Sequence, residues 1–232
     1  MSLFRLLVPA LLFLSTAAMA DNCPLTPYTI DYQSRYKFGW FGFDIEARRE
    51  LSQLEDGRWK LDFSAKASMA NLQELSVFTC TDSLITPGDY LYRAGGVIDE
   101  DDRTLVFIPQ NGVIRDQEKD KTYDDAWQDG IQDNLTYIQQ ASIALAQNKT
   151  EFSFPVFEKK KTKVFRFQVE GEETIEVPAG KFQAIKVRQL RDDKDREIYA
   201  WFAKQDGFPL IRLKDKDNGK EKYRIEATRL SF

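Results

Sequence analysis

The side chains able to do chemistry in this sequence are mainly carboxylates, because the 232-residue chain contains no histidine. Histidine is the usual general base near neutral pH and the commonest metal ligand. Its absence excludes Ser-His-Asp and Cys-His triads, HExxH zinc sites and haem held by histidine. The glycine-rich motifs GxGxxG and GxxxxGK[ST], which bind nucleotide phosphates, are also missing. We therefore expect no cofactor and no metal.

Paired carboxylates are the remaining route to catalysis, as in glycosidases, which place two acids across a cleft. Glu173 and Glu176, or Asp133, are the candidates. Glu173 and Glu176 are an odd number of residues apart, so in a regular strand they face opposite sides. The acidic stretches at 99–103, 191–196 and 214–220 lack the ligand spacing of a calcium loop and are typical of solvated loops. The sequence assigns no catalytic residue.

Residues 1–20 have the pattern of a secretory signal peptide, with Arg5, then an apolar run, then Ala18-Met19-Ala20 before the cleavage point. The alternative, an uncleaved anchor, needs about 20 apolar residues to span a bilayer, more than this run provides. We predict a mature chain of residues 21–232. Cys23 and Cys80 then enter an oxidising compartment, where one disulfide is expected and two separate thiols are the alternative.

The composition is that of a globular domain, with 42% hydrophobic, 13% aromatic and 30% charged residues. The formal net charge of −4 argues against nucleic-acid binding, which needs a cationic face for phosphates. We expect one β-rich domain over 21–232, or two sheet portions joined by a helix at about 125–147.

Alternating apolar residues interrupted by turn motifs predict antiparallel strands joined by short hairpins. The turns are Asp56-Gly57, Asn111-Gly112, Asn218-Gly219 and Pro178-Ala179-Gly180. The fold class that follows is mainly β, as a curved antiparallel sheet or a partly open barrel or sandwich, with one amphipathic helix packed on it.

The helix is predicted from an apolar spacing of three and four residues at Trp127, Ile131, Leu135, Ile138, Ala141 and Leu145. Asp124, Asp125 or Asp129 are the expected N-terminal caps, and Gly130 suggests where the regular part begins. The apolar stripe packs on the sheet, or alternatively docks onto a helix of another protein.

The segment YKFGWFGFDIEA is interpreted as one strand with apolar residues on both faces. One face is expected in the core, and the other in a second core layer or along a pocket for an apolar ligand. The candidate ligand-lining residues are Phe38, Trp40, Phe41 and Phe43.

Five segments together resemble the bacterial domain-of-unknown-function 3108 family over nearly the whole mature chain. They are YTIDYQSRYKFGWFGFDIEARREL, TPGDYLY, QDNLTYIQQ, EGEETIEVPAGKFQAIKVRQLR and REIYAWFAKQDGFPLIRLK. The signature residues of that resemblance are Gly171, Glu173, Pro178, Ala179, Gly180, Phe182, Trp201 and Pro209. The lysine run in FEKKKTKVF departs from the family's Asp-Gly turn. The resemblance implies an exported, sheet-rich envelope protein and carries no catalytic residue, and the signal peptide predicts the periplasm as its location.

These observations lead to three function hypotheses. The first is an envelope carrier or chaperone that binds a lipid-like ligand in an apolar interior with room to spare. The second is a structural module that docks onto an envelope protein, and the third is a carboxylate-based glycan hydrolase. An integral membrane barrel is disfavoured because EARRELSQL and KVRQLRDDK carry charges on both strand faces.

Overall fold

The fold is one antiparallel sheet of 14 strands with one α-helix, seen in a computed structural model that describes residues 23–38, 41–193 and 195–232. The N-terminal strands are β1 (Tyr28–Phe38), β2 (Phe41–Gln53), β3 (Trp59–Ala67), β4 (Ala70–Thr81), β5 (Leu84–Gly96), β6 (Arg103–Ile108), β7 (Val113–Asp116) and β8 (Lys121–Tyr123), with a 3-10 turn η1 (Pro109–Asn111) after β6. After α1 (Thr136–Ala146) come β9 (Glu151–Glu158), β10 (Lys161–Val177), β11 (Gly180–Leu190), β12 (Arg196–Ala203), β13 (Leu210–Asp217) and β14 (Lys220–Ser231).

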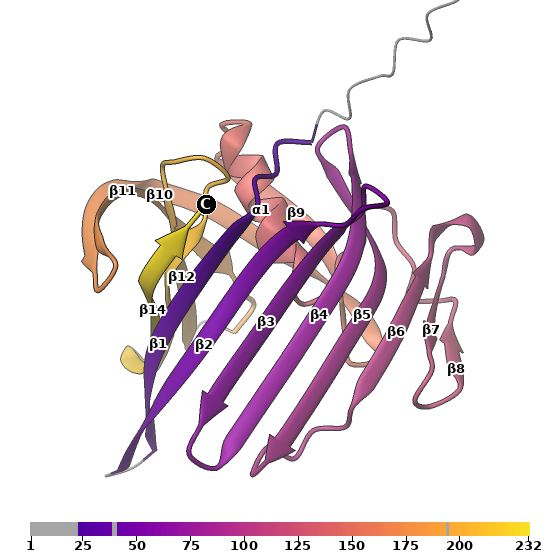
Figure 1. Cartoon of the computed structure of the whole chain (residues 1–232), viewed down its shortest axis with the longest axis horizontal. Helices are drawn as coiled ribbons and strands as arrows, with labels where there is room; N and C mark the ends of the chain where they lie inside the picture. The colour runs from indigo at the N-terminus through magenta and orange to yellow at the C-terminus, as the bar shows by residue number, and fades with distance from the viewer. Residues whose placement is uncertain (1–22, 39–40, 194) are drawn as a thin grey trace, which may run out of the picture.

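The sheet consists of two meanders joined where β1 pairs with β14, for example Tyr32 with Ala227. Its outer strands, β8 and β9, do not pair with each other, so hydrogen bonds do not close it into a barrel. Figure 1 shows the N-terminal strands in front, α1 behind them and the C-terminal strands curving round the other side. The expected fold class, a curved and partly open antiparallel sheet with one principal helix, is confirmed.

All four turn motifs lie at connections between strands as expected, with Gly180 as the first residue of β11. Asn218 and Gly219 have φ angles of +51° and +72°, the left-handed pair that a tight hairpin connection requires. Gly112 and Gly180 also have positive φ angles, of +62° and +134°.

The core lies on the concave face of the sheet and is completed by α1. Along β1, every second side chain is buried, at Tyr28, Ile30 and Tyr32, as expected for a strand with one face in the core. Ile143 and Leu145 of α1 are also buried. The helix therefore fills much of the space that the curved sheet encloses.

The helix is shorter than predicted, because it begins at Thr136 and not near residue 130. Asp133 caps it: its Oδ1 accepts the N–H groups of Leu135 and Thr136, each at 2.8 Å. Just before the helix, Gln132 exchanges backbone hydrogen bonds with Pro155 and Phe157 of β9. These bonds hold the stretch in an extended, non-helical conformation. The prediction of a helix from about 125, capped by Asp124, Asp125 or Asp129, is therefore wrong in its first half.

The segment interpreted as one strand with two apolar faces is instead parts of two strands. β1 ends at Phe38 and β2 begins at Phe41, and the two run antiparallel. The interpretation of this segment as one continuous strand is therefore wrong, because the two described strands run in opposite directions.

Cys23 and Cys80 form a disulfide, which fixes the chain before β1 to β4. Within the described residues no helix combines the length and the apolar character needed to cross a bilayer.

Candidate functional site

The four residues proposed from the sequence to line a ligand pocket cannot be placed. Trp40 and the side chains of Phe38, Phe41 and Phe43 lie outside the described residues. Their role in binding stays a prediction.

The signature residues hold the β10–β11 hairpin as a hook against β12–β14. Trp201 Nε1 donates to Glu173 Oε1 at 2.6 Å, and Ala179 N donates to the carbonyl of Ala227 at 2.9 Å. Arg212 adds a bond from Nη2 to the carbonyl of Glu176, at 2.5 Å. The hook is the curved orange hairpin in Figure 1.

The other signature residues also have backbone or packing roles. Gly171 lies at a bulge in β10 with a φ angle of +151°, a conformation that strongly favours glycine. Phe182 packs against the core, and the carbonyl of Pro209 accepts the N–H of Ala203 at 2.9 Å. In the structure, therefore, the signature shapes the hook.

A buried polar cluster lies where the chain enters α1. Ser76 Oγ donates to Asp133 Oδ2 at 2.5 Å, and Arg49 donates from Nη2 to the carbonyl of Leu135 at 3.2 Å. Burial raises the pKa of the Asp133 carboxyl, and the bonds from Ser76 and from backbone N–H groups partly offset this. Asp133 and Glu173, two of the candidate acids, thus both make bonds that hold the fold together.

The site best suited to a ligand is an apolar crevice between α1 and the concave face of β10–β13. Its walls are Tyr137, Ile138, Ala141, Phe167, Val187, Ile198, Ala200, Phe202, Leu210 and Leu213. The crevice has a free volume of about 30 Å³, close to the share of one water molecule in the liquid. The roomy interior expected from the sequence is thus replaced, in this part of the molecule, by a narrow apolar slot.

Aromatic side chains form the edge of this crevice. Phe167 stacks on Tyr137 with ring centroids 6.1 Å apart, and Phe165 meets Tyr137 edge-on at 5.3 Å. Tyr137, Phe165 and Phe167 are only half-buried, and no described group hydrogen-bonds the Tyr137 hydroxyl. The edge of the crevice is thus aromatic, carries one hydroxyl and is partly reachable from solvent.

Gln189 is the polar residue in the crevice wall. It lies in register with Phe167 on β10 and Ile198 on β12, and only 9% of its surface is exposed. Within the described part of the chain its side-chain amide has no hydrogen-bond partner. Because Gln189 also lines the open groove beside the crevice, its amide is available to a ligand or to water.

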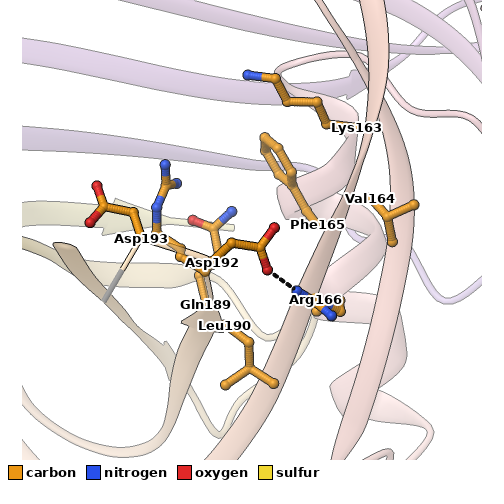
Figure 2. Close-up of a pocket in the computed structure, with 9 residues that line it drawn as sticks. Lys163, Val164, Phe165, Arg166, Gln189, Leu190, Asp192 and Asp193 are labelled. Atoms are coloured by element: carbon orange, nitrogen blue, oxygen red, sulfur yellow. Dashed lines mark hydrogen bonds and ion pairs between the residues drawn. The ribbon is translucent and has the colours of Figure 1, made fainter. Parts of the chain in front are cut away.

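An open groove of about 550 Å³ continues from the crevice past Gln189. It is lined by Lys163, Val164, Phe165, Arg166, Gln189, Leu190, Arg191, Asp192 and Asp193. In Figure 2, Phe165 and the Gln189 amide lie on the same side of the hairpin, while Val164 and Leu190 point away from them. Arg166 and Asp192 form an ion pair at 2.6 Å.

This site was not predicted from the sequence, although the sequence contains a signal for part of it. In KFQAIKVRQL, the residues Ile185, Val187 and Gln189 are two positions apart and therefore lie on the same strand face. That pattern places a glutamine at the end of an apolar row, which is where the structure has it.

The chain resembles a solved structure of similar architecture. A crystal structure described as a beta-barrel-like protein of domain of unknown function DUF1849, from Brucella abortus, has a TM-score of 0.60 and 10% sequence identity, and the match covers 90% of this chain and 98% of that one. A "putative lipoprotein" from Parabacteroides distasonis matches with a TM-score of 0.38 and 12% identity over 90% of this chain and 97% of that one. No curated protein matches the sequence significantly. The sequence pattern of the family described as protein of unknown function DUF3108 matches residues 28–226, and the chain belongs to that family.

Proposed function

We propose that this protein is exported to the periplasm and binds the apolar chain of an amphiphile in the crevice between α1 and β10–β13. The observation that carries the proposal is the crevice itself, with its half-buried aromatic edge and the unpaired amide of Gln189. The signal-like residues 1–20 supply the export step.

Binding requires the crevice to widen, because its free volume of about 30 Å³ is too small for an acyl chain. Rotation of Tyr137 and Phe167 widens it, since both are half-buried at its edge. The separate edges of β8 and β9 favour the same movement, because no ladder of hydrogen bonds fixes one meander to the other there.

Native mass spectrometry of protein purified from cells tests the proposal, together with titration calorimetry using dodecyl phosphate and dodecyl maltoside below their micelle concentrations. We expect a bound amphiphile and saturable binding of at least one detergent. Ala200→Leu, which fills the crevice, should abolish binding. Ala65→Leu on β3 is the matched control and should bind normally. A ligand-free mass without any detergent binding would reject the proposal.

Docking onto an envelope protein is the alternative function, through the free edge of β8. The edge is three residues long, and Lys121 lies over the ring of Tyr123 at 4.7 Å. Short strands and lysines discourage edge pairing, so we place docking second. Consistent crosslinking of one partner in cells, combined with a ligand-free mass, would reverse that order.

A further inference from the structure

We infer that the mouth of the crevice, at Gln189 and Arg191, is a subsite for the anionic end of the amphiphile. This inference rests on the proposed function and adds a head-group chemistry to it. It commits to a phosphate or a carboxylate attached to an apolar chain.

Gln189 lies at the boundary between apolar and polar surroundings. It contributes both to the apolar crevice and to the open groove that continues from it. On the crevice side its strand neighbours are Val187 and Ile185, which are buried. On the groove side come Arg191 and Asp193. A molecule with its chain in the crevice would therefore place its polar end beside the Gln189 amide.

Among the described residues that line the groove, one cationic side chain has no ion-pair partner. Lys163 pairs with Glu158, and Arg166 pairs with Asp192. Arg191 makes no ion pair with any described residue. Its guanidinium is a planar set of donors suited to a phosphate or a carboxylate.

Asp193 is the opposing charge in the groove. Its Oδ1 accepts the N–H of Asp195 at 3.1 Å, and it does not pair with Arg191. A neutral or cationic head group would leave Arg191 without a counter-charge, whereas an anion supplies one.

The concave face beyond Gln189 also supports an anionic subsite, because the acid Asp215 on this face is already paired with Arg196. Asp215 is fully buried and is held by Arg196, with Nη2 2.6 Å from Oδ2. Next to it, burial and Asp215 raise the pKa of the Tyr223 hydroxyl, which stays protonated as a donor, and Arg191 lies close enough to act on it in the opposite direction. An anion at the mouth thus meets Arg191 and the Gln189 amide, with Asp215 already paired.

The test compares dodecyl phosphate with dodecyl maltoside, which share an apolar chain and differ in charge, by titration calorimetry on the full mature chain. We expect dodecyl phosphate to bind about tenfold more tightly, since charge-assisted hydrogen bonds are stronger than neutral ones and part of this advantage is lost to solvent screening. Arg191→Gln should remove that preference and leave maltoside binding unchanged. Gln189→Leu should weaken phosphate binding and leave maltoside binding equal or stronger.

Matched controls are Arg188→Gln, on the opposite face of β11, and Gln168→Leu, on β10 with its amide bonded to Glu151 at 3.2 Å. Both should keep the wild-type preference. Equal binding of the two detergents to the wild type, or a preference that survives Arg191→Gln, overturns the anionic subsite while the proposed function stands. If neither detergent binds the wild type, the proposed function fails with it. Inorganic phosphate alone should bind far more weakly than dodecyl phosphate, and equal affinity would also reject an amphiphile.

Discussion

Glu74 is a half-buried acid on the core-facing side of β4, and its environment makes stability depend on pH. Its Oε2 accepts the hydroxyl of Tyr90 at 2.5 Å. Burial raises the pKa of the Glu74 carboxyl, the bond from Tyr90 lowers it, and the neighbouring Asp133 raises it further. Because the folded state holds this proton more tightly than the unfolded state does, stability falls as pH rises from the ordinary pKa of a glutamate to the higher folded value.

Glu74→Gln should reduce this loss of stability. The amide keeps an acceptor for Tyr90 but does not titrate, so the free energy of unfolding should fall less between about pH 4 and pH 7 than in the wild type. Urea unfolding across that range measures the difference. Glu55→Gln, at an exposed position, should follow the wild-type curve. Parallel curves for the wild type and Glu74→Gln would show that Glu74 does not contribute.

Trp201 and Glu173 should be energetically coupled through the bond that holds the hook. A double-mutant cycle with Trp201→Phe and Glu173→Ala should give a coupling energy of about 1 kcal/mol, because the bond is charged but partly solvated. Denaturant unfolding of the wild type, the two single variants and the double variant measures this coupling energy. The same cycle with Glu176→Ala should give a value near zero. Coupling to Glu176 as large as to Glu173 would contradict a direct bond between Trp201 and Glu173.

At the scale of elements, hairpins could be predicted and the start of the helix could not. Asn218-Gly219 specifies its turn locally, because the two residues tolerate the positive φ angles that the turn needs. The apolar spacing from Trp127 to Leu135 is also a local signal, but the conformation of this stretch is set by hydrogen bonds to a distant part of the chain. Gln132 pairs with the backbone beside β9, and Gly130 has a φ angle of +75°. Apolar residues that are buried in a non-helical stretch show the same spacing there.

Gly171→Ala should weaken the hook through the backbone alone. No atom lies within 4 Å of the position that a Cβ would take, so the cost comes from the φ angle of +151°, at about 1–3 kcal/mol. The free energy of unfolding measures it. Gln168→Ala, on the same strand, should cost less than about 0.5 kcal/mol. Equal effects of the two changes would show that the bulge at Gly171 is not strained for alanine.

At the scale of the whole molecule, the disulfide links Cys23 to Cys80 across 57 residues of chain. Removing it by Cys23→Ser with Cys80→Ser should lower the free energy of unfolding by about 4 kcal/mol in the loop-entropy model. Chemical unfolding of the double variant, compared with the oxidised wild type, measures this. Reduction of the wild type should produce the same loss. A loss below about 1 kcal/mol would mean that the unfolded chain is already restricted.

The candidate site could be predicted only in part, because it depends on which strands face α1. Composition and turn motifs predict a curved sheet with an apolar interior, and the strand KFQAIKVRQL predicts the row that ends in Gln189. Which strands lie across from Tyr137, and how much space remains there, depends on the order in which β9–β14 follow α1 around the sheet. That order brings together residues that are far apart in the sequence, and such contacts cannot be predicted from a local sequence pattern.

The pairing of β1 with β14 has a consequence during synthesis. Tyr32 finds its partner Ala227 only when nearly the entire polypeptide has been made. Until then the first meander has an unprotected edge, able to join strands of other unfinished copies. The half-built sheet therefore keeps an open edge until its final strand arrives.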